Sequence, residues 1–145
     1  MMLLLVSFVA FVAVVSAGDF TPSQVHLALA GVDSTGIAVS YQTAKATTTS
    51  TVKFGKSSSI YTDIIQGTRS IYYETVHHHI VLTALAPSTK YYYVVGDDAG
   101  GWSSELHFTS PATSSLRGNF SFLVFADLGT VNGGPSNEMI KSLKV

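Results

Sequence analysis

The sequence contains no cysteine, so no disulfide bond can hold its fold together. Charged residues are also scarce: they make up 12% of the 145 residues, and the formal net charge is -1. This balance excludes a strongly basic nucleic-acid binder and a disordered acidic tail. Hydrophobic residues account for 46% of the chain, and we expect a hydrophobic core to provide the stability that disulfides cannot.

The first 17 residues carry no charge and are almost entirely apolar. The apolar run is about 15 residues long, which is shorter than the roughly 20 residues that a membrane-spanning helix needs. Small residues, Val15 and Ala17, close the run before Gly18. We therefore predict a signal peptide over residues 1–17, cleaved after Ala17, and a secreted protein that leaves the membrane after cleavage.

From residue 24 onwards, short runs rich in Val, Ile, Tyr, Phe and Thr are separated by Gly, Asp, Ser and Pro. This pattern is typical of an all-β sandwich. The polar residues 45–50 are predicted to form a solvated connector, and residues 97–101 a hairpin connection. Seven strands are predicted, at residues 24–30, 36–42, 51–55, 60–65, 70–82, 90–95 and 104–109. The fifth of them has a possible break.

Alternation within the strands predicts which side chains face the core, because successive strand residues point to opposite faces. One face of each of three strands is apolar or aromatic. These predicted core residues are Val25, Leu27 and Leu29 in the first strand, Ile37, Val39 and Tyr41 in the second, and Tyr91, Tyr93 and Val95 in the sixth.

Three consecutive histidines, residues 77–79, are the first candidates for chemistry. On a strand, His77 and His79 face one way and His78 the other, so the three cannot easily share one tetrahedral metal site. We interpret them as surface or domain-contact residues. His26 and His107 are likewise interpreted as strand residues rather than ligands.

The segment LAPSTKY, residues 85–91, has the layout of a tyrosine corner, in which a tyrosine hydroxyl reaches back to the backbone just upstream. Leu85, Pro87 and Tyr91 carry the motif. Taken together, this motif and the order of the strands resemble a fibronectin type III domain. Such domains usually carry Trp at the position of Tyr41, whose ring can fill the same core site. Sandwiches of this kind are more often spacers or binding modules than enzymes.

A different pattern begins after the Ser- and Thr-bearing linker at residues 113–118. Residues 120–126, FSFLVFA, are nearly continuously apolar, as in a parallel strand that is covered on both faces. A glycine-bearing loop and a helix starting near Ser136 are predicted to follow, which gives a strand-loop-helix unit. Asn119 opens the sequon Asn-Phe-Ser and is a candidate glycosylation site.

Asp127 follows this apolar strand directly, at the place where ligands gather in open α/β sheets. A carboxylate at this position can reach a hard metal ion, while Gly129 lets the chain turn sharply away. An aspartate that caps a helix or forms a turn would give the same short motif. The residues alone leave both interpretations open.

The order of the segments PSQVHLALA, VHHHIVLTALAPSTKYYYVVGD, WSSELHFTSP and FLVFADLG resembles the N-terminal part of a purple acid phosphatase. The resemblance covers essentially all of the chain after the signal peptide. It implies a fibronectin-like N-terminal domain at 18–112, the linker at 113–118, and the first β-α unit of an incomplete α/β metallophosphoesterase domain at 119–145.

In that family a GDxG motif supplies the first carboxylate of a binuclear centre, which pairs Fe3+ with Zn2+, Mn2+ or Fe2+ and acts on phosphate monoesters. Asp127 and Gly129 match this motif, and Ala126 replaces its first glycine. The family's later motifs would lie beyond Val145. The resemblance therefore implies a fragment that has no catalytic residue of its own and binds no metal tightly. The alternative is a free-standing secreted sandwich that serves as a binding or adhesion module.

Overall fold

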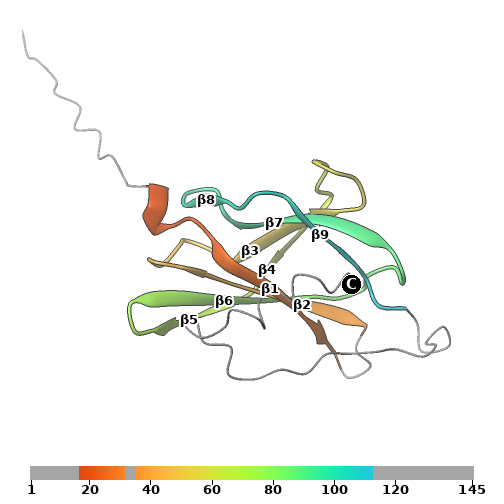
Figure 1. Ribbon diagram of the computed structural model, residues 1–145, viewed down its shortest axis with the longest axis horizontal. Helices are drawn as coiled ribbons and strands as arrows, with labels where there is room; N and C mark the ends of the chain where they lie inside the picture. Colours follow the sequence, from red (N-terminus) through yellow and green to blue (C-terminus); the bar gives the residue numbers. More distant parts are fainter. Residues whose placement is uncertain (1–16, 32–34, 113–145) are drawn as a thin grey trace, which may run out of the picture.

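The computed structural model describes residues 17–31 and 35–112. They form a short 3₁₀ helix, η1 (Ala17–Asp19), and nine strands (Figure 1). The predicted strand-loop-helix unit at 119–145 lies outside the described residues. The strands are β1 (Ser23–Ala30), β2 (Gly36–Thr43), β3 (Thr51–Gly55), β4 (Asp63–Gln66), β5 (Thr68–Tyr72), β6 (Thr75–Leu82), β7 (Lys90–Asp97), β8 (Gly101–Trp102) and β9 (Leu106–Thr109).

The strands form two antiparallel sheets that pack face to face (Figure 1). The first sheet has the order β1-β2-β6-β5. The second has the order β4-β3-β7-β8, and β9 also pairs with β7. The prediction of a mainly β, antiparallel sandwich is confirmed, since alternating strands of this length need a second layer to bury their apolar faces.

The core lies between the sheets and is built from β2 and β6 on one side and from β3, β7 and β9 on the other. The predicted core residues of β2 and β7 are all buried, so this part of the prediction is confirmed. The core cluster consists of Ile37, Val39, Tyr41, Val52, Phe54, Ile80, Leu82, Tyr91, Tyr93, Val95 and Phe108.

The prediction for β1 is wrong at two of its three positions. Leu27 is 37% exposed and Leu29 is 66% exposed, while Val25 packs partly buried against the core. The alternation itself is correct, because Leu27 pairs with Val39 and Leu29 with Ile37, and both partners are buried. β1 is an edge strand, however, so its inward side chains are less covered than those of the central strands.

The strands differ from the prediction most clearly in three places. The strand predicted at 60–65 is reduced to β4, because a turn closed by the Ile60 N–H and the Ser57 carbonyl occupies its start. The strand predicted at 70–82 breaks at Tyr73, whose positive φ of 51° makes the turn between β5 and β6. The two-residue strand β8 was not predicted, since a pair of residues carries no detectable alternation.

The predicted hairpin connection joins β7 to β8, and Gly101 supplies a positive φ of 100°. Gly96 faces it closely: a Cβ atom at Gly96 would lie 2.1 Å from the Gly101 carbonyl oxygen. Only glycine fits at position 96 without moving the backbone.

The hydroxyl of Tyr91 accepts a hydrogen bond from the Ala86 N–H at 3.0 Å, the contact expected of a tyrosine corner. The Tyr91 ring is buried and stacks on Phe108, with 5.6 Å between the ring centroids. The contact therefore ties the connection between β6 and β7 to the core.

Replacing Tyr91 by Phe is expected to lower the free energy of unfolding by about 1 to 2 kcal/mol, because the Ala86 N–H loses its acceptor while the ring is kept. Urea denaturation of residues 18–145 measures the change. Tyr92→Phe is the matched control, since no hydrogen bond of the Tyr92 hydroxyl occurs among the described residues. Equal stability of the two variants would show that the hydroxyl contact contributes nothing.

Candidate functional site

His78 is buried between the sheets, with 1% of its surface exposed. Its Nε2 lies 3.0 Å from the Thr43 hydroxyl and its Nδ1 lies 2.8 Å from the Ser50 hydroxyl. The ring stacks on Tyr41, with centroids 4.3 Å apart and planes 7° apart. The prediction of a surface histidine is therefore wrong for His78, because its face of β6 is covered by the second layer.

Burial lowers the pKa of His78 to about 4, and the nearby positive charge of Arg69 adds to the effect, while Asp97 opposes it. Burial likewise raises the pKa of Tyr41 to about 12. His78 is therefore neutral near pH 7, and both of its ring nitrogens are engaged by hydroxyl groups. It has no free lone pair for a metal ion, and its role is structural.

His77 and His79 face the opposite way from His78 and are exposed, so the predicted alternation is confirmed. On this outer face, the register aligns His26, Ser40, His79 and Thr68 in one row across all four strands of the sheet. The His79 Nδ1 lies 3.1 Å from the Ser40 hydroxyl. No group of three or more His, Cys, Asp or Glu residues that could hold a metal ion occurs within 17–31 and 35–112.

Asp97 is a buried carboxylate that the sequence did not single out. It accepts hydrogen bonds from the Thr49 N–H at 3.0 Å and from the Gly100 N–H. These contacts join the connection between β2 and β3 to the hairpin after β7. The turn pattern DDAGG predicted this hairpin, but it does not distinguish the buried Asp97 from the exposed Asp98.

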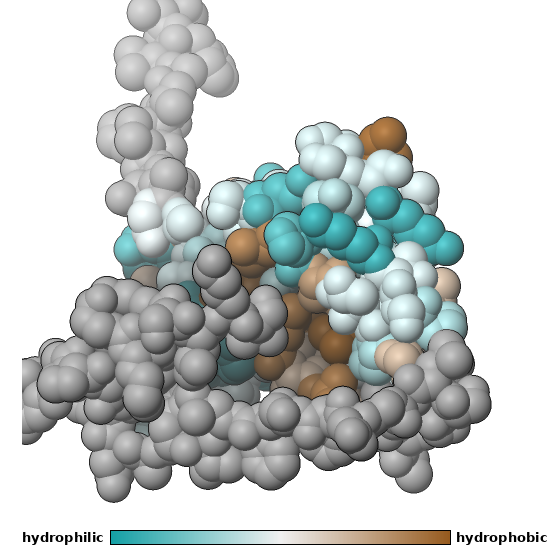
Figure 2. All heavy atoms as spheres, turned by 45° about the vertical axis from the view of Figure 1, so that its right-hand side comes forward, coloured by the Kyte–Doolittle hydropathy of each residue, from teal (hydrophilic) through white to brown (hydrophobic). Residues whose placement is uncertain are grey.

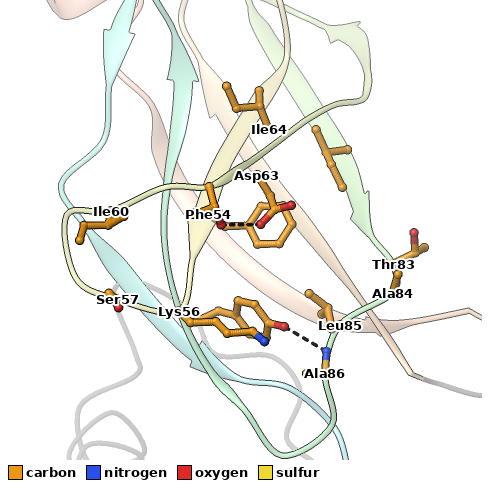
Figure 3. A pocket seen from close by; sticks show the side chains of 13 residues that line it. Phe54, Lys56, Ser57, Ile60, Asp63, Ile64, Thr83, Ala84, Leu85 and Ala86 are labelled. Atoms are coloured by element: carbon orange, nitrogen blue, oxygen red, sulfur yellow. Dashed lines mark hydrogen bonds between the residues drawn. The ribbon is translucent and has the colours of Figure 1, made fainter.

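A hollow of about 660 Å³ opens beside the connection after β6 (Figure 3). Phe54, Leu85 and Tyr91 contribute apolar surface to it. Among the described residues, its only charged lining side chains are Lys56 and Asp63. It contains no imidazole and no pair of carboxylates, so it has the character of a contact groove rather than a catalytic centre.

The predicted metal ligand Asp127, its neighbour Gly129 and the glycosylation candidate Asn119 lie outside the described residues, as does the predicted signal peptide up to residue 16. In the part of the chain that the structure describes, no helix has the length and apolar character needed to cross a bilayer.

Comparison with known proteins identifies the β-sandwich. Residues 22–110 match the family described as "Purple acid Phosphatase, N-terminal domain". The chain belongs to the purple acid phosphatase family. The matched residues run from just before β1 to just after β9, so they comprise the whole described sandwich of this purple acid phosphatase domain.

Two curated relatives of this purple acid phosphatase chain carry phosphatase names. A phosphoenolpyruvate phosphatase of Allium cepa is 32% identical over 120 residues, which is 79% of this chain. Purple acid phosphatase 21 of Arabidopsis thaliana is 33% identical over 115 residues, which is 76% of this chain. The chain spans 24% of the length of each of these relatives.

Proposed function

We propose that the chain is the N-terminal part of a secreted purple acid phosphatase, and that the complete protein hydrolyses phosphoric monoesters. The observation that carries the proposal is the match of residues 22–110 to the N-terminal domain of this family. The phosphatase names of the two relatives support it. The apolar residues 1–17 support secretion.

Within this proposal the β-sandwich is a non-catalytic domain. Its buried polar residues, His78 and Asp97, are fully engaged in contacts within the domain. Among the described residues, its histidines form no group that could hold a metal ion. The reaction is therefore assigned to residues of the complete protein outside the sandwich.

The metal-binding side chains of this chain are not sufficient by themselves to form a binuclear metal centre. Such a centre needs several ligands for each ion, held in place by further contacts. Asp127 is the one ligand that the sequence predicts, and the described residues add no cluster to it. We propose that Asp127 is the first carboxylate ligand of the metal centre, and that other parts of the complete protein supply the remaining ligands.

The chain alone is expected not to hydrolyse phosphate esters. Purified residues 18–145, supplied with Fe3+ together with Zn2+ or Mn2+, are assayed with p-nitrophenyl phosphate at mildly acidic pH. We expect no turnover above that of the metals alone, because one carboxylate neither holds two ions nor positions them. In a longer protein that includes the rest of the family's sequence, we expect turnover.

In the longer protein, Asp127→Asn is expected to lower metal content and rate together. Asp63→Asn is the control, since Asp63 is an exposed aspartate of the sandwich. Turnover by residues 18–145 that disappears in Asp127→Asn would contradict the assignment of the reaction to the complete protein. A longer protein that binds metal but shows no turnover would contradict the phosphatase proposal itself.

A further inference from the structure

The outer face of the first sheet carries a row of imidazole and hydroxyl groups. The register aligns His26 of β1, Ser40 of β2, His79 of β6 and Thr68 of β5 across the sheet, and these four residues are here called the outer histidine row. All four line a hollow of about 300 Å³, and both histidines are exposed. The row therefore presents hydrogen-bond donors to solvent in a concave surface.

Each of the two rings uses one nitrogen for a contact within the domain. The His26 Nδ1 lies 2.8 Å from the Gln24 carbonyl oxygen, which can only accept, so Nδ1 carries a proton. The His79 Nδ1 lies 3.1 Å from the Ser40 hydroxyl. Among the described residues, neither Nε2 atom takes part in a hydrogen bond. These contacts orient the two rings and leave Nε2 of each for a ligand.

The backbone next to His26 is held in a costly conformation. The register of β1 shifts between Ser23 and His26, and Gln24 has a positive φ of 52°, which residues other than glycine seldom adopt. Such conformations persist only where the surrounding contacts enforce them, and they are common at ligand sites. Here the strained residue supplies the carbonyl that orients the His26 ring.

The first sheet has no negative charge of its own. None of its four strands contains Asp or Glu. Glu74 lies in the turn between β5 and β6, at the opposite end of that hairpin from Thr68 and His79. Arg69 also lines the hollow, and its guanidinium donates to the Thr47 carbonyl. Protonated histidines in the row therefore give a positive surface that no carboxylate of the sheet neutralises.

Two further titratable side chains share this outer face. The rings of His77 and Tyr72 meet edge to face, with 6.0 Å between their centroids. His77 precedes His79 by two positions on the same face of β6, at a backbone distance of roughly 6 to 7 Å, and it lines the hollow as well. His77 therefore adds a positive charge beside the row when it is protonated.

The spacing within the row suits one tetrahedral oxyanion. Only Ser40 separates His26 from His79, so their backbones are two strand spacings apart, roughly 9 to 10 Å. An oxyanion that accepts one hydrogen bond from each ring spans roughly 8 Å between the two nitrogens. The short Ser40 side chain leaves room for the anion between the rings. Hydrogen bonds between imidazolium groups and an anion are also among the stronger ones in proteins.

We propose that the outer histidine row binds a phosphate group, with the Nε2 atoms of His26 and His79 as its two charged donors. The apolar surface that Figure 2 shows in a hollow between polar rims is unsuited to an anion. A free phosphate ion and a phosphate ester of a larger molecule offer the same chemistry to the row. The inference adds a binding site to the non-catalytic domain and does not rest on hydrolysis.

NMR titration of residues 18–145 tests the proposal directly. Inorganic phosphate and glucose 6-phosphate are added in separate experiments, with chloride at the same ionic strength as the reference. At about pH 5.5 we expect saturable shifts of the His26 and His79 ring signals, with a Kd on the order of 1 to 10 mM. At about pH 7.5 we expect binding that is weaker on the order of 10-fold, because neutral imidazoles donate no charged hydrogen bond at Nε2.

Substitution of both histidines gives a second measurement. His26→Gln combined with His79→Gln is expected to weaken phosphate binding on the order of 10-fold or more, because both charged donors are lost. His107→Gln is the matched control, since His107 is an exposed histidine on β9 of the second sheet, and it is expected to leave binding unchanged. Undiminished binding by the double variant, or no saturable shift of either ring in the unaltered chain, would overturn the proposal.

The two phosphate probes distinguish the source of the bound group. Tighter binding of glucose 6-phosphate would support the site and assign it to a phosphate ester, whereas equal or tighter binding of inorganic phosphate would support it and assign it to the free ion. Ring shifts that chloride produces equally would overturn the proposal, because the row would then respond only to screening by salt.

Discussion

Lowering the pH from about 6.5 to about 5 is expected to reduce the free energy of unfolding by about 2 kcal/mol through His78 alone, with 1.36 kcal/mol for each pKa unit. In the folded chain the pKa of His78 is lowered to about 4 by burial, whereas an exposed histidine has a pKa near 6.5. At a pH between these two values, His78 binds a proton in the unfolded chain but not in the folded chain.

The direction of the pH effect on stability follows from this difference in the number of bound protons. Stability is lost as the pH falls below about 6.5, and the loss through His78 is complete near pH 4, where the folded chain also takes up the proton. The full loss is about 3 kcal/mol. Charged groups near the ring act in both directions, since Arg69 and His77 lower its pKa and Asp97 raises it.

Urea denaturation of residues 18–145 between pH 7 and pH 5 measures the effect. His77→Gln, a change at the exposed neighbour, is expected to retain the pH dependence, whereas His78→Gln is expected to lose most of it. An NMR titration of the His78 ring in the unaltered chain gives the same answer without a substitution. A His78 ring that titrates near pH 6.5 would contradict the prediction.

Replacing Asp97 by Ala is expected to cost about 3 kcal/mol, because two backbone N–H groups lose their acceptor and each buried unsatisfied group costs roughly 1 to 3 kcal/mol. The groups are the N–H of Thr49 and the N–H of Gly100. Both connections that Asp97 joins would then be held only by their own backbone contacts. Thermal and urea unfolding measure the loss.

Asp98→Ala is the matched control for this prediction. Asp98 follows Asp97 directly, but it is exposed, and its contact with Lys53 at 2.9 Å is a surface ion pair. Surface pairs contribute little because water and salt screen them. If the Asp98 variant is destabilised as much as the Asp97 variant, the buried contacts of Asp97 are not what holds the connections. Asp97→Asn is expected to fall between the two, since its amide offers one acceptor oxygen in place of two.

Local patterns predicted the sandwich because its central strands obey them. β2 and β7 carry their predicted core residues at alternate positions, and all of these residues are buried. β3 was predicted at its observed bounds, residues 51–55. In these strands the local pattern and the tertiary burial of the predicted core residues agree.

The incorrect predictions share one physical cause: whether a side chain is buried depends on what the opposite layer of the sandwich places over it. Leu27 and Leu29 have the pattern of core residues, but β1 is an edge strand, and the two side chains are 37% and 66% exposed. His78 has the pattern of a surface residue, but Thr43 and Ser50 reach it from other segments and satisfy both ring nitrogens. Asp97 is buried for the same reason. Such partners are distant in sequence, and no local pattern contains them.

The pairing of β7 has a consequence for the order in which the domain assembles during synthesis. β7 is central in the second sheet, and it pairs with β3, which lies well before it in the sequence, and with β9, the last strand. The first sheet likewise joins β2 to the much later β6. Pairings between distant segments form slowly, because the loops that separate them must close first. A growing chain therefore cannot complete the second sheet until β9 has been translated and released. The domain therefore folds late in synthesis, after its last strand has been released.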